Sequence, residues 1–223
     1  MVNTVRSHFD SRATNYDGNR RYLIPNFDEF YSIGVDSLVC SKADPRVLDL
    51  GGGTGLLTLF LLRRYPKAHV TLLDFSEEML TIARERYRNN PNIDFAVGDY
   101  RFHSLEGPFD IVISGLSIHH LSFEEKQELT DRIYQLLSAT GEFLNVDLAK
   151  GENEQIEQEM HRRLDDFLYE NLTEEQVQGF RDSQLLDIPV TINEQFDLMR
   201  KSGFTVIDCL YRYWIYGVFY GQK

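Results

Sequence analysis

The chain has few cysteines and no long hydrophobic segment. Its 223 residues include only two cysteines, Cys40 and Cys209, which lie far apart and form none of the short spacings of a metal site. We therefore expect two reduced thiols, as in a cytosolic protein, and predict no metal site. The longest apolar run, at 56–62, is far shorter than the roughly 20 residues that a membrane-spanning helix needs, so no membrane partner is expected.

The chain also lacks an apolar signal region and an excess of positive charge. Its first ten residues, "MVNTVRSHFD", are mostly polar, so we expect no export and a cytoplasmic location. Lysine and arginine number 23 against 35 aspartates and glutamates, which gives a formal net charge of −12. Because basic side chains supply most of the affinity for phosphate backbones, this balance argues against a nucleic-acid partner.

What the chain does have is an alternation of strand-like runs and helical patterns from Arg46 onward. The predicted strands are 46–50, 69–74, 93–99, 109–115 and 141–147. The predicted helices between them are 55–65, 76–90 and 122–137, and the last two begin with the N-cap residues Ser76 and Ser122. This alternation predicts an α/β fold with a doubly wound, Rossmann-like parallel sheet.

Two regions depart from that alternation. Residues 1–45 contain a polar segment and a predicted helix at 27–40, and residues 150–190 contain apolar residues at helical spacing with a second helix from Thr173. The helical spacing is that of Ile156, Met160, Leu164, Phe167 and Leu168. Ligands of doubly wound folds lie beyond the carboxyl ends of the strands. We therefore interpret residues 1–45 as a helical cap segment, and residues 46–223 as the main domain with a cap insertion at about 150–190. A purely structural helix pair is the alternative.

The C-terminal tail, residues 204–223, contains two aromatic β-type runs joined around Arg212–Trp214. A hairpin is the simplest interpretation, and it adds two antiparallel strands to the five above. The fold prediction is thus a mostly parallel seven-stranded sheet that ends in an antiparallel hairpin and carries a small helical cap. A homodimer through this aromatic edge stays open.

The stretch "VLDLGGGTG", residues 47–55, does not fit the dinucleotide motif G-x-G-x-x-G/A. From Gly51 the third glycine is replaced by Leu56, and from Gly53 it is replaced by Thr58. A bulky residue there obstructs the close packing of helix and strand that the dinucleotide motif needs. The pattern that does fit is D-x-G-x-G-x-G, formed by Asp49, Gly51, Gly53 and Gly55.

Acidic residues follow at the ends of the next two predicted strands. Asp74 can accept hydrogen bonds from two ribose hydroxyls, and Asp99 can accept one from the exocyclic amine of an adenine. Tyr100, or Phe75 and Met79, can supply apolar surface for the ring. The order of these residues on successive strands predicts an adenosine-containing cofactor.

With these motifs the chain resembles the class I S-adenosylmethionine-dependent methyltransferases. The resemblance rests on "VLDLGGGTG", "VTLLDFSEEML", "FAVGDY" and "FDIVISGLSIHHL", in the family's order. It implies S-adenosyl-L-methionine as the cofactor and a small-molecule methyl acceptor as the partner. The cofactor residues that it implies are Asp49, Gly51, Gly52, Gly53, Asp74, Asp99, Tyr100 and Ser114.

Methyl transfer is an in-line displacement that mainly requires the acceptor to be aligned with the methyl group. A base is needed only if the acceptor must lose a proton, and His119 is the preferred candidate, with His120 as the alternative. Tyr16 could close over the sulfonium, and Arg21 could pair with a carboxylate of the cofactor or of the acceptor.

A narrower resemblance is to the carboxy-S-adenosylmethionine synthases, which serve tRNA wobble modification, and to their methyltransferase relatives. It rests on residues 8–31, the insertion and the ending "SGFTVIDCLYRYWIYGVFYGQK". The synthases hold the extra carboxylate with an arginine, but Leu198 occupies that position here, with Arg200 one turn away. Methyl transfer is therefore preferred. A synthase, a non-catalytic cofactor-binding protein and, less favoured, a nicotinamide oxidoreductase stay open.

Overall fold

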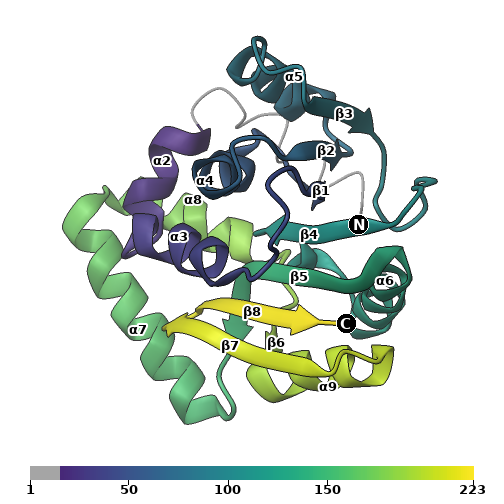
Figure 1. Ribbon diagram of the computed structural model, residues 1–223. Coiled ribbons are helices and arrows are strands. Elements are labelled where there is room, and N and C mark those ends of the chain that lie inside the picture. Colours follow the sequence, from purple (N-terminus) through teal and green to yellow (C-terminus); the bar gives the residue numbers. More distant parts are fainter. Residues whose placement is uncertain (1–15) are drawn as a thin grey trace.

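In the computed structural model, which describes residues 16–223, helices cover both faces of one twisted sheet (Figure 1). The strand order is β3-β2-β1-β4-β5-β8-β7, and a short β6 pairs with β5. The strands are β1 (Arg46–Leu50), β2 (His69–Asp74), β3 (Ile93–Val97), β4 (Phe109–Gly115), β5 (Leu137–Lys150), β6 (Val190–Thr191), β7 (Val206–Tyr213) and β8 (Tyr216–Gln222).

The sheet confirms the predicted architecture, with one added strand. Strands β1 to β5 pair in parallel, and β8 lies antiparallel between β5 and β7. The sheet has eight strands rather than seven because Val190–Thr191 aligns with Ala149–Lys150 where the chain returns from the insertion. Strand β5 is also longer than predicted, because it continues on both sides of 141–147.

The predicted helices are present, and the structure adds α2, α9 and a 3₁₀ turn to them. The helices are α2 (Tyr16–Leu23), α3 (Phe27–Ser37), α4 (Leu56–Arg64), α5 (Glu77–Arg86), α6 (Phe123–Leu136), α7 (Glu154–Asn171), α8 (Glu174–Gln184) and α9 (Ile192–Ser202), with a 3₁₀ turn η2 (Ile118–His120). The Ser76 side chain accepts a hydrogen bond from the backbone N–H of Met79. Ser122 and Glu125 form a complete capping box, which satisfies two otherwise unpaired N–H groups at the start of α6.

The period of two in the strands divides the core into two layers. In β1, Val47 faces the cluster that contains α3 and α4, whereas Leu48 and Leu50 face the cluster on the side of α6 and α9. Each of these side chains is at most 1 % exposed. Burying an aliphatic side chain of this size stabilises the fold by about 1.5–3 kcal/mol, so the alternation holds the strand in its register.

The two regions predicted as a cap differ in where they pack. Helix α3 lies directly on the sheet, and its Phe30 and Tyr31 are 0 % and 3 % exposed in the core. Helix α7 places Leu164 and Leu168 in the same cluster and contacts α2 and α8 beyond α3 (Figure 1). The first region therefore contributes a core helix as well as α2, and the division into cap and main domain stays a prediction.

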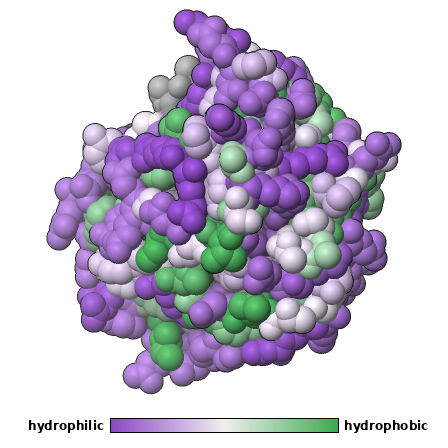
Figure 2. All heavy atoms as spheres, viewed as in Figure 1, coloured by the Kyte–Doolittle hydropathy of each residue, from purple (hydrophilic) through white to green (hydrophobic). Residues whose placement is uncertain are grey.

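One face of the molecule carries its hydrophobic side chains in a limited area. Figure 2 shows that hydrophilic residues dominate this face and that hydrophobic ones gather around α3 and the β7–β8 hairpin. Within residues 16–223, no helix is both long enough and apolar enough to cross a bilayer. The predicted homodimer at this edge remains a prediction.

Candidate functional site

A cavity of about 260 Å³ lies at the carboxyl ends of the central strands. It is bounded by the glycine loop after β1, the ends of β2 and β3, and the segment between β4 and α6. The predicted cofactor residues that line it are Asp49, Gly51, Gly52, Gly53, Asp74, Phe75, Met79, Asp99 and Tyr100. Ligands of doubly wound sheets bind at this edge, so the structure brings the predicted residues together in the expected place.

The glycine loop needs glycine for two separate reasons. Gly51 has φ 65°, and a Cβ there would come within 2.0 Å of Ser117 Oγ, so no other residue fits. Gly53 has φ 53°, and its N–H donates to Asp74 Oδ2 at 2.9 Å. The loop is therefore closely packed on one side and tied to the end of β2 on the other.

Asp49 is fully buried at the end of β1 and lines the cavity. Its Oδ2 accepts a hydrogen bond from Thr58 Oγ1 at 2.6 Å, but its Oδ1 is buried without a hydrogen-bond partner within residues 16–223. Burial raises the pKa of Asp49 to about 7 against the opposing effect of Thr58, and the nearby Asp74 adds to the rise. Buried polar atoms almost always have partners, so this oxygen indicates a ligand with a donor or a positive charge.

Asp74 is held in place by backbone groups. Its Oδ1 accepts from the N–H of Ser76 at 2.8 Å, in addition to the bond from Gly53. Asp74 also lines the cavity. Its orientation is therefore set before any ligand arrives.

Asp99 lies two residues beyond the end of β3 and forms an ion pair that the sequence analysis did not identify. Arg101 Nη2 lies 2.6 Å from Asp99 Oδ2, and the same guanidinium contacts Glu125. Burial opposes ionisation of Asp99, but the hydrogen bonds from Arg101 outweigh it and lower the pKa of Asp99. Arg101 and Glu125 both line the cavity. The position of Arg101 directly after "GDY" is the signal that could have found it.

Two further predicted residues stabilise this edge in different ways. The hydroxyl of Tyr100 donates to the Ser117 carbonyl oxygen at 3.3 Å, and its ring is buried against the cavity. Ser114 is fully buried, and its Oγ donates to the Leu50 carbonyl oxygen at 2.8 Å. Gly115, rather than Ser114, lines the cavity, so Ser114 joins the ends of β1 and β4.

Helix α2 meets the glycine loop through Asp17 rather than through the residues that the sequence suggested. Thr54 Oγ1 donates to Asp17 Oδ1 at 2.7 Å, and Arg86 forms an ion pair with the same carboxylate. Arg21 is exposed, pairs with Asp28 at 2.7 Å and does not line the cavity. Tyr16 begins α2, but its side chain lies outside the described part of the chain.

His119 is buried and lies between two carboxylates. Its Nδ1 is 2.5 Å from Asp147 Oδ1, its Nε2 is 3.3 Å from Asp187 Oδ1, and it does not line the cavity. Burial lowers the pKa of His119, but the two carboxylates outweigh burial and raise it to about 9. A cationic imidazole cannot accept a proton, so both geometry and charge oppose the predicted role of His119 as a base.

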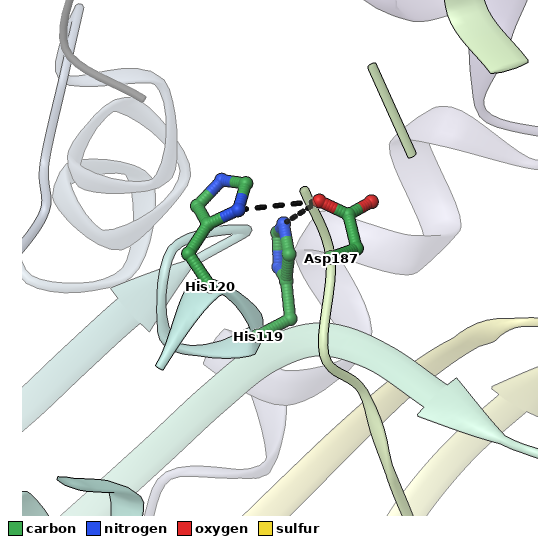
Figure 3. Close-up of side chains that lie close together, drawn as sticks. All are labelled: His119, His120 and Asp187. Carbon is green, nitrogen blue, oxygen red and sulfur yellow. Dashed lines mark ion pairs between the residues drawn. The ribbon is translucent and has the colours of Figure 1, made fainter. Parts of the chain in front are cut away.

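His120 is the histidine that lines the cavity. Its Nδ1 is 3.2 Å from Asp187 Oδ1, and Figure 3 shows both imidazoles facing this oxygen from η2. Burial and the charge of His119 lower the pKa of His120. Asp187 is part-buried, but its bonds to the two histidines outweigh that effect and hold its pKa well below the ordinary value.

A buried lysine ties the end of the insertion to this cluster. Lys126 is 2 % exposed, and its Nζ donates to the carbonyl oxygens of Ile188, at 2.7 Å, and of Leu121. The Ile188 N–H in turn donates to the His119 carbonyl oxygen at 2.8 Å. The segment that carries Asp187 is thereby held against η2. Lys126, Asp147 and Asp187 were not predicted, and only Asp147, at the end of the fifth predicted strand, carried a local signal.

The known proteins that this chain resembles are methyltransferases. Residues 47–141 match the family model described as a methyltransferase domain. The chain is 31 % identical over 143 residues to a malonyl-[acyl-carrier protein] O-methyltransferase of Bacillus cereus, covering 63 % of this chain and 52 % of that protein. It is 29 % identical over 168 residues to an uncharacterized methyltransferase of Staphylococcus carnosus, covering 74 % of this chain and 78 % of the relative. The chain thus spans about half the length of the first of these relatives.

Solved structures show the same fold at lower identity. Human N-acetylserotonin methyltransferase in complex with S-adenosylmethionine has a TM-score of 0.61 at 20 % identity, covering 87 % of this chain and 51 % of that one. Haemonchus contortus phosphoethanolamine N-methyltransferase 2, also with S-adenosylmethionine, has a TM-score of 0.63 at 22 % identity, covering 82 % and 38 %. At these identities the likeness concerns the fold.

Proposed function

We propose that this chain, which belongs to the class I S-adenosylmethionine-dependent methyltransferases, transfers the methyl group of S-adenosylmethionine to a small-molecule acceptor. The observation that carries the proposal is the cavity in which the glycine loop, the end of β2 and the segment after β3 converge. Those elements lie within residues 47–141, the part that matches the methyltransferase domain.

The cavity has groups suited to each part of the cofactor. The buried Asp49 Oδ1 would accept a hydrogen bond from the cofactor's ammonium group, and the loop at Gly51 would lie against the methionine part. Asp74 would accept from the ribose hydroxyls and Asp99 from the adenine amine. The apolar surface for the ring comes from Phe75, Met79 and Tyr100.

The cofactor, when bound, supplies an activated methyl group, so the chain has to position an acceptor and exclude water. We assign the acceptor to the part of the cavity that the cofactor motifs do not supply. That part is lined by Tyr31, Leu57, Leu116, His120 and Leu121. These residues come from α3, α4 and the turn after β4, so the acceptor's shape is selected by elements outside the glycine loop.

The synthase alternative finds no support in the described residues. Leu198 is 1 % exposed within α9, Arg200 pairs with Asp197 on the surface, and neither lines the cavity. Arg212 donates to the Lys150 carbonyl oxygen instead. Among the described residues, Arg101 is the arginine that lines the cavity, and Asp99 and Glu125 already neutralise it. We therefore retain methyl transfer.

The acceptor class and the location follow from the relatives' names and from the composition of the chain. The named relatives include a malonyl-[acyl-carrier protein] O-methyltransferase and a Plasmodium falciparum phosphoethanolamine N-methyltransferase, so their names span oxygen and nitrogen acceptors. We propose a cytosolic enzyme that acts on a small acceptor group without a nucleic-acid partner. The net charge of −12 supports the absence of a nucleic-acid partner, because it disfavours a polyanionic substrate.

The first test is mass spectrometry of small molecules released when freshly purified protein is denatured. S-adenosylmethionine or S-adenosylhomocysteine is the expected result, with calorimetry giving the affinity of added cofactor. Release of carboxy-S-adenosylmethionine would instead favour the synthase. The absence of both released cofactor and calorimetric binding of added cofactor would overturn the proposal.

A further inference from the structure

A second group of side chains lies beside the cavity, and His120 is the member of it that also lines the cavity. His119 Nε2 and His120 Nδ1 lie 3.3 Å and 3.2 Å from the same atom, Asp187 Oδ1 (Figure 3). The three ligand atoms all lie within 4.8 Å of one another. We call His119, His120 and Asp187 the histidine–aspartate cluster.

The spacing of these atoms matches that of a metal's ligands. A transition metal lies about 2.0–2.2 Å from imidazole nitrogens and carboxylate oxygens, so adjacent ligands stand about 3.0–3.5 Å apart. The two nitrogen-to-oxygen distances, 3.3 Å and 3.2 Å, fall in this interval.

His119 is also oriented as metal-bound histidines are. Its Nδ1 faces Asp147 Oδ1 at 2.5 Å, and its backbone N–H donates to Asp147 Oδ2 at 3.0 Å. A carboxylate on the far ring nitrogen is the usual partner of a metal-ligating histidine, because it sets the tautomer and the ring direction. Asp147 therefore directs the Nε2 of His119 toward Asp187.

Charge gives an independent reason for a cation in this place. The side chains of Asp147 and Asp187 are 3 % and 12 % exposed, and buried carboxylates need a positive charge close by. The ammonium group of Lys126, which donates to the Ile188 carbonyl oxygen, supplies one positive charge. A divalent ion between His119, His120 and Asp187 would supply the second.

We infer that His119, His120 and Asp187 bind a divalent first-row transition metal ion, with Asp147 as the positioning residue of His119. Two imidazoles and one carboxylate suit Zn²⁺, Fe²⁺ or Mn²⁺ rather than Mg²⁺ or Ca²⁺, which prefer oxygen ligands. Because His120 also lines the cavity, the ion would stand beside the acceptor. That last consequence rests on the proposed methyl transfer, whereas the metal site itself does not.

The test titrates the chelator-treated full-length chain with Zn²⁺ by calorimetry and with Co²⁺ by visible absorption. We expect one ion per chain for both probes and no comparable binding of Mg²⁺. Absence of stoichiometric binding of both Zn²⁺ and Co²⁺ would overturn the inference.

Three variants locate the site. Asp187→Asn removes the carboxylate with little change of shape and should weaken Zn²⁺ at least about a hundredfold, while Asp147→Asn should weaken it about 10–100-fold through His119. His161→Gln is the matched control, because His161 is a part-exposed histidine that pairs with Glu157 at 3.0 Å outside the cluster. Unchanged Zn²⁺ affinity in Asp187→Asn, or equal loss in His161→Gln, would place the ion elsewhere.

The two proposals fail separately. Circular dichroism and S-adenosylmethionine affinity of Asp187→Asn show whether the fold and the cofactor site persist, and Asp147→Asn serves the same purpose if Asp187→Asn does not fold. Cofactor binding without metal binding overturns only the metal site. Metal binding without cofactor binding overturns only the proposed methyl transfer.

Discussion

The glycine-loop end and the histidine end of the cavity are assembled in different ways. At the glycine-loop end, Asp49 and Asp74 lie at the carboxyl ends of β1 and β2, and Asp99 lies two residues after β3. Each of these carboxylates accepts a hydrogen bond from a residue at most nine positions away along the chain. At the histidine end, His119, Asp147 and Asp187 come from segments separated by 28 and 40 residues and meet only in the folded chain. Local motifs can therefore reveal the first end, while the second depends on tertiary packing.

The largest expected effect is a loss of stability when the histidine end is disrupted. His119→Ala leaves Asp147 and Asp187 buried without the imidazole between them. Breaking a buried ion pair in this way costs about 3–5 kcal/mol of unfolding free energy. Chemical denaturation of the metal-free protein measures it, with His161→Ala as the control for loss of a part-exposed imidazole. A loss below about 1 kcal/mol would show that water screens the cluster.

Asp74→Ala should act on the cofactor instead. Removing this carboxylate leaves the ribose hydroxyls without acceptors, so S-adenosylmethionine affinity should fall by about 1–3 kcal/mol. Calorimetry measures the affinity, and Glu78→Ala, an exposed residue on the neighbouring α5, is the matched control. Equal affinity in wild type and Asp74→Ala would rule out the ribose assignment.

Asp49 predicts a pH dependence at the glycine-loop end. Its pKa is raised to about 7 in the fold, against an ordinary value of 3.8, so the folded state binds a proton that the unfolded state has released. Stability from this group is therefore lost as pH rises from about 4 to about 7. Asp49→Asn does not titrate and so has no such loss. The unfolding free energy of Asp49→Asn minus that of wild type should therefore increase by about 1–3 kcal/mol between pH 5 and pH 8.

Urea unfolding of wild type and Asp49→Asn at several pH values measures this difference, because the other titrating groups are common to both. Parallel stability profiles would contradict the assignment. The same variant should bind S-adenosylmethionine more weakly, since an amide cannot supply the negative charge for an ammonium group.

The smallest expected effect concerns Arg21. It is exposed and paired with Asp28 away from the cavity, so Arg21→Ala should leave S-adenosylmethionine affinity within about twofold of wild type. Direct calorimetric comparison decides this. A large loss would show that α2 rearranges when the cofactor binds, and it would restore the role that the sequence suggested.

Much of the fold could be predicted because its signals are local. The strand-like run "RVLDL", the N-caps Ser76 and Ser122, and the aromatic runs of the tail all lie where the structure has the matching elements. Strand β6 could not be predicted, because two residues carry no period and pair only where the chain returns to β5. The ion pair of Arg101 with Glu125 could not be predicted for a related reason, since it joins residues 24 positions apart in the chain.

The sequence by itself determined the order of strands and helices, the glycine loop and the acidic residues that follow β2 and β3. These depend on backbone preferences and on spacings of a few residues, which are present before the chain folds. Only the tertiary structure decided which histidine faces the cavity and which is enclosed by carboxylates. Adjacent residues on one turn point in different directions, and Asp147 and Asp187 reach His119 through parallel strand pairing and the return of the insertion.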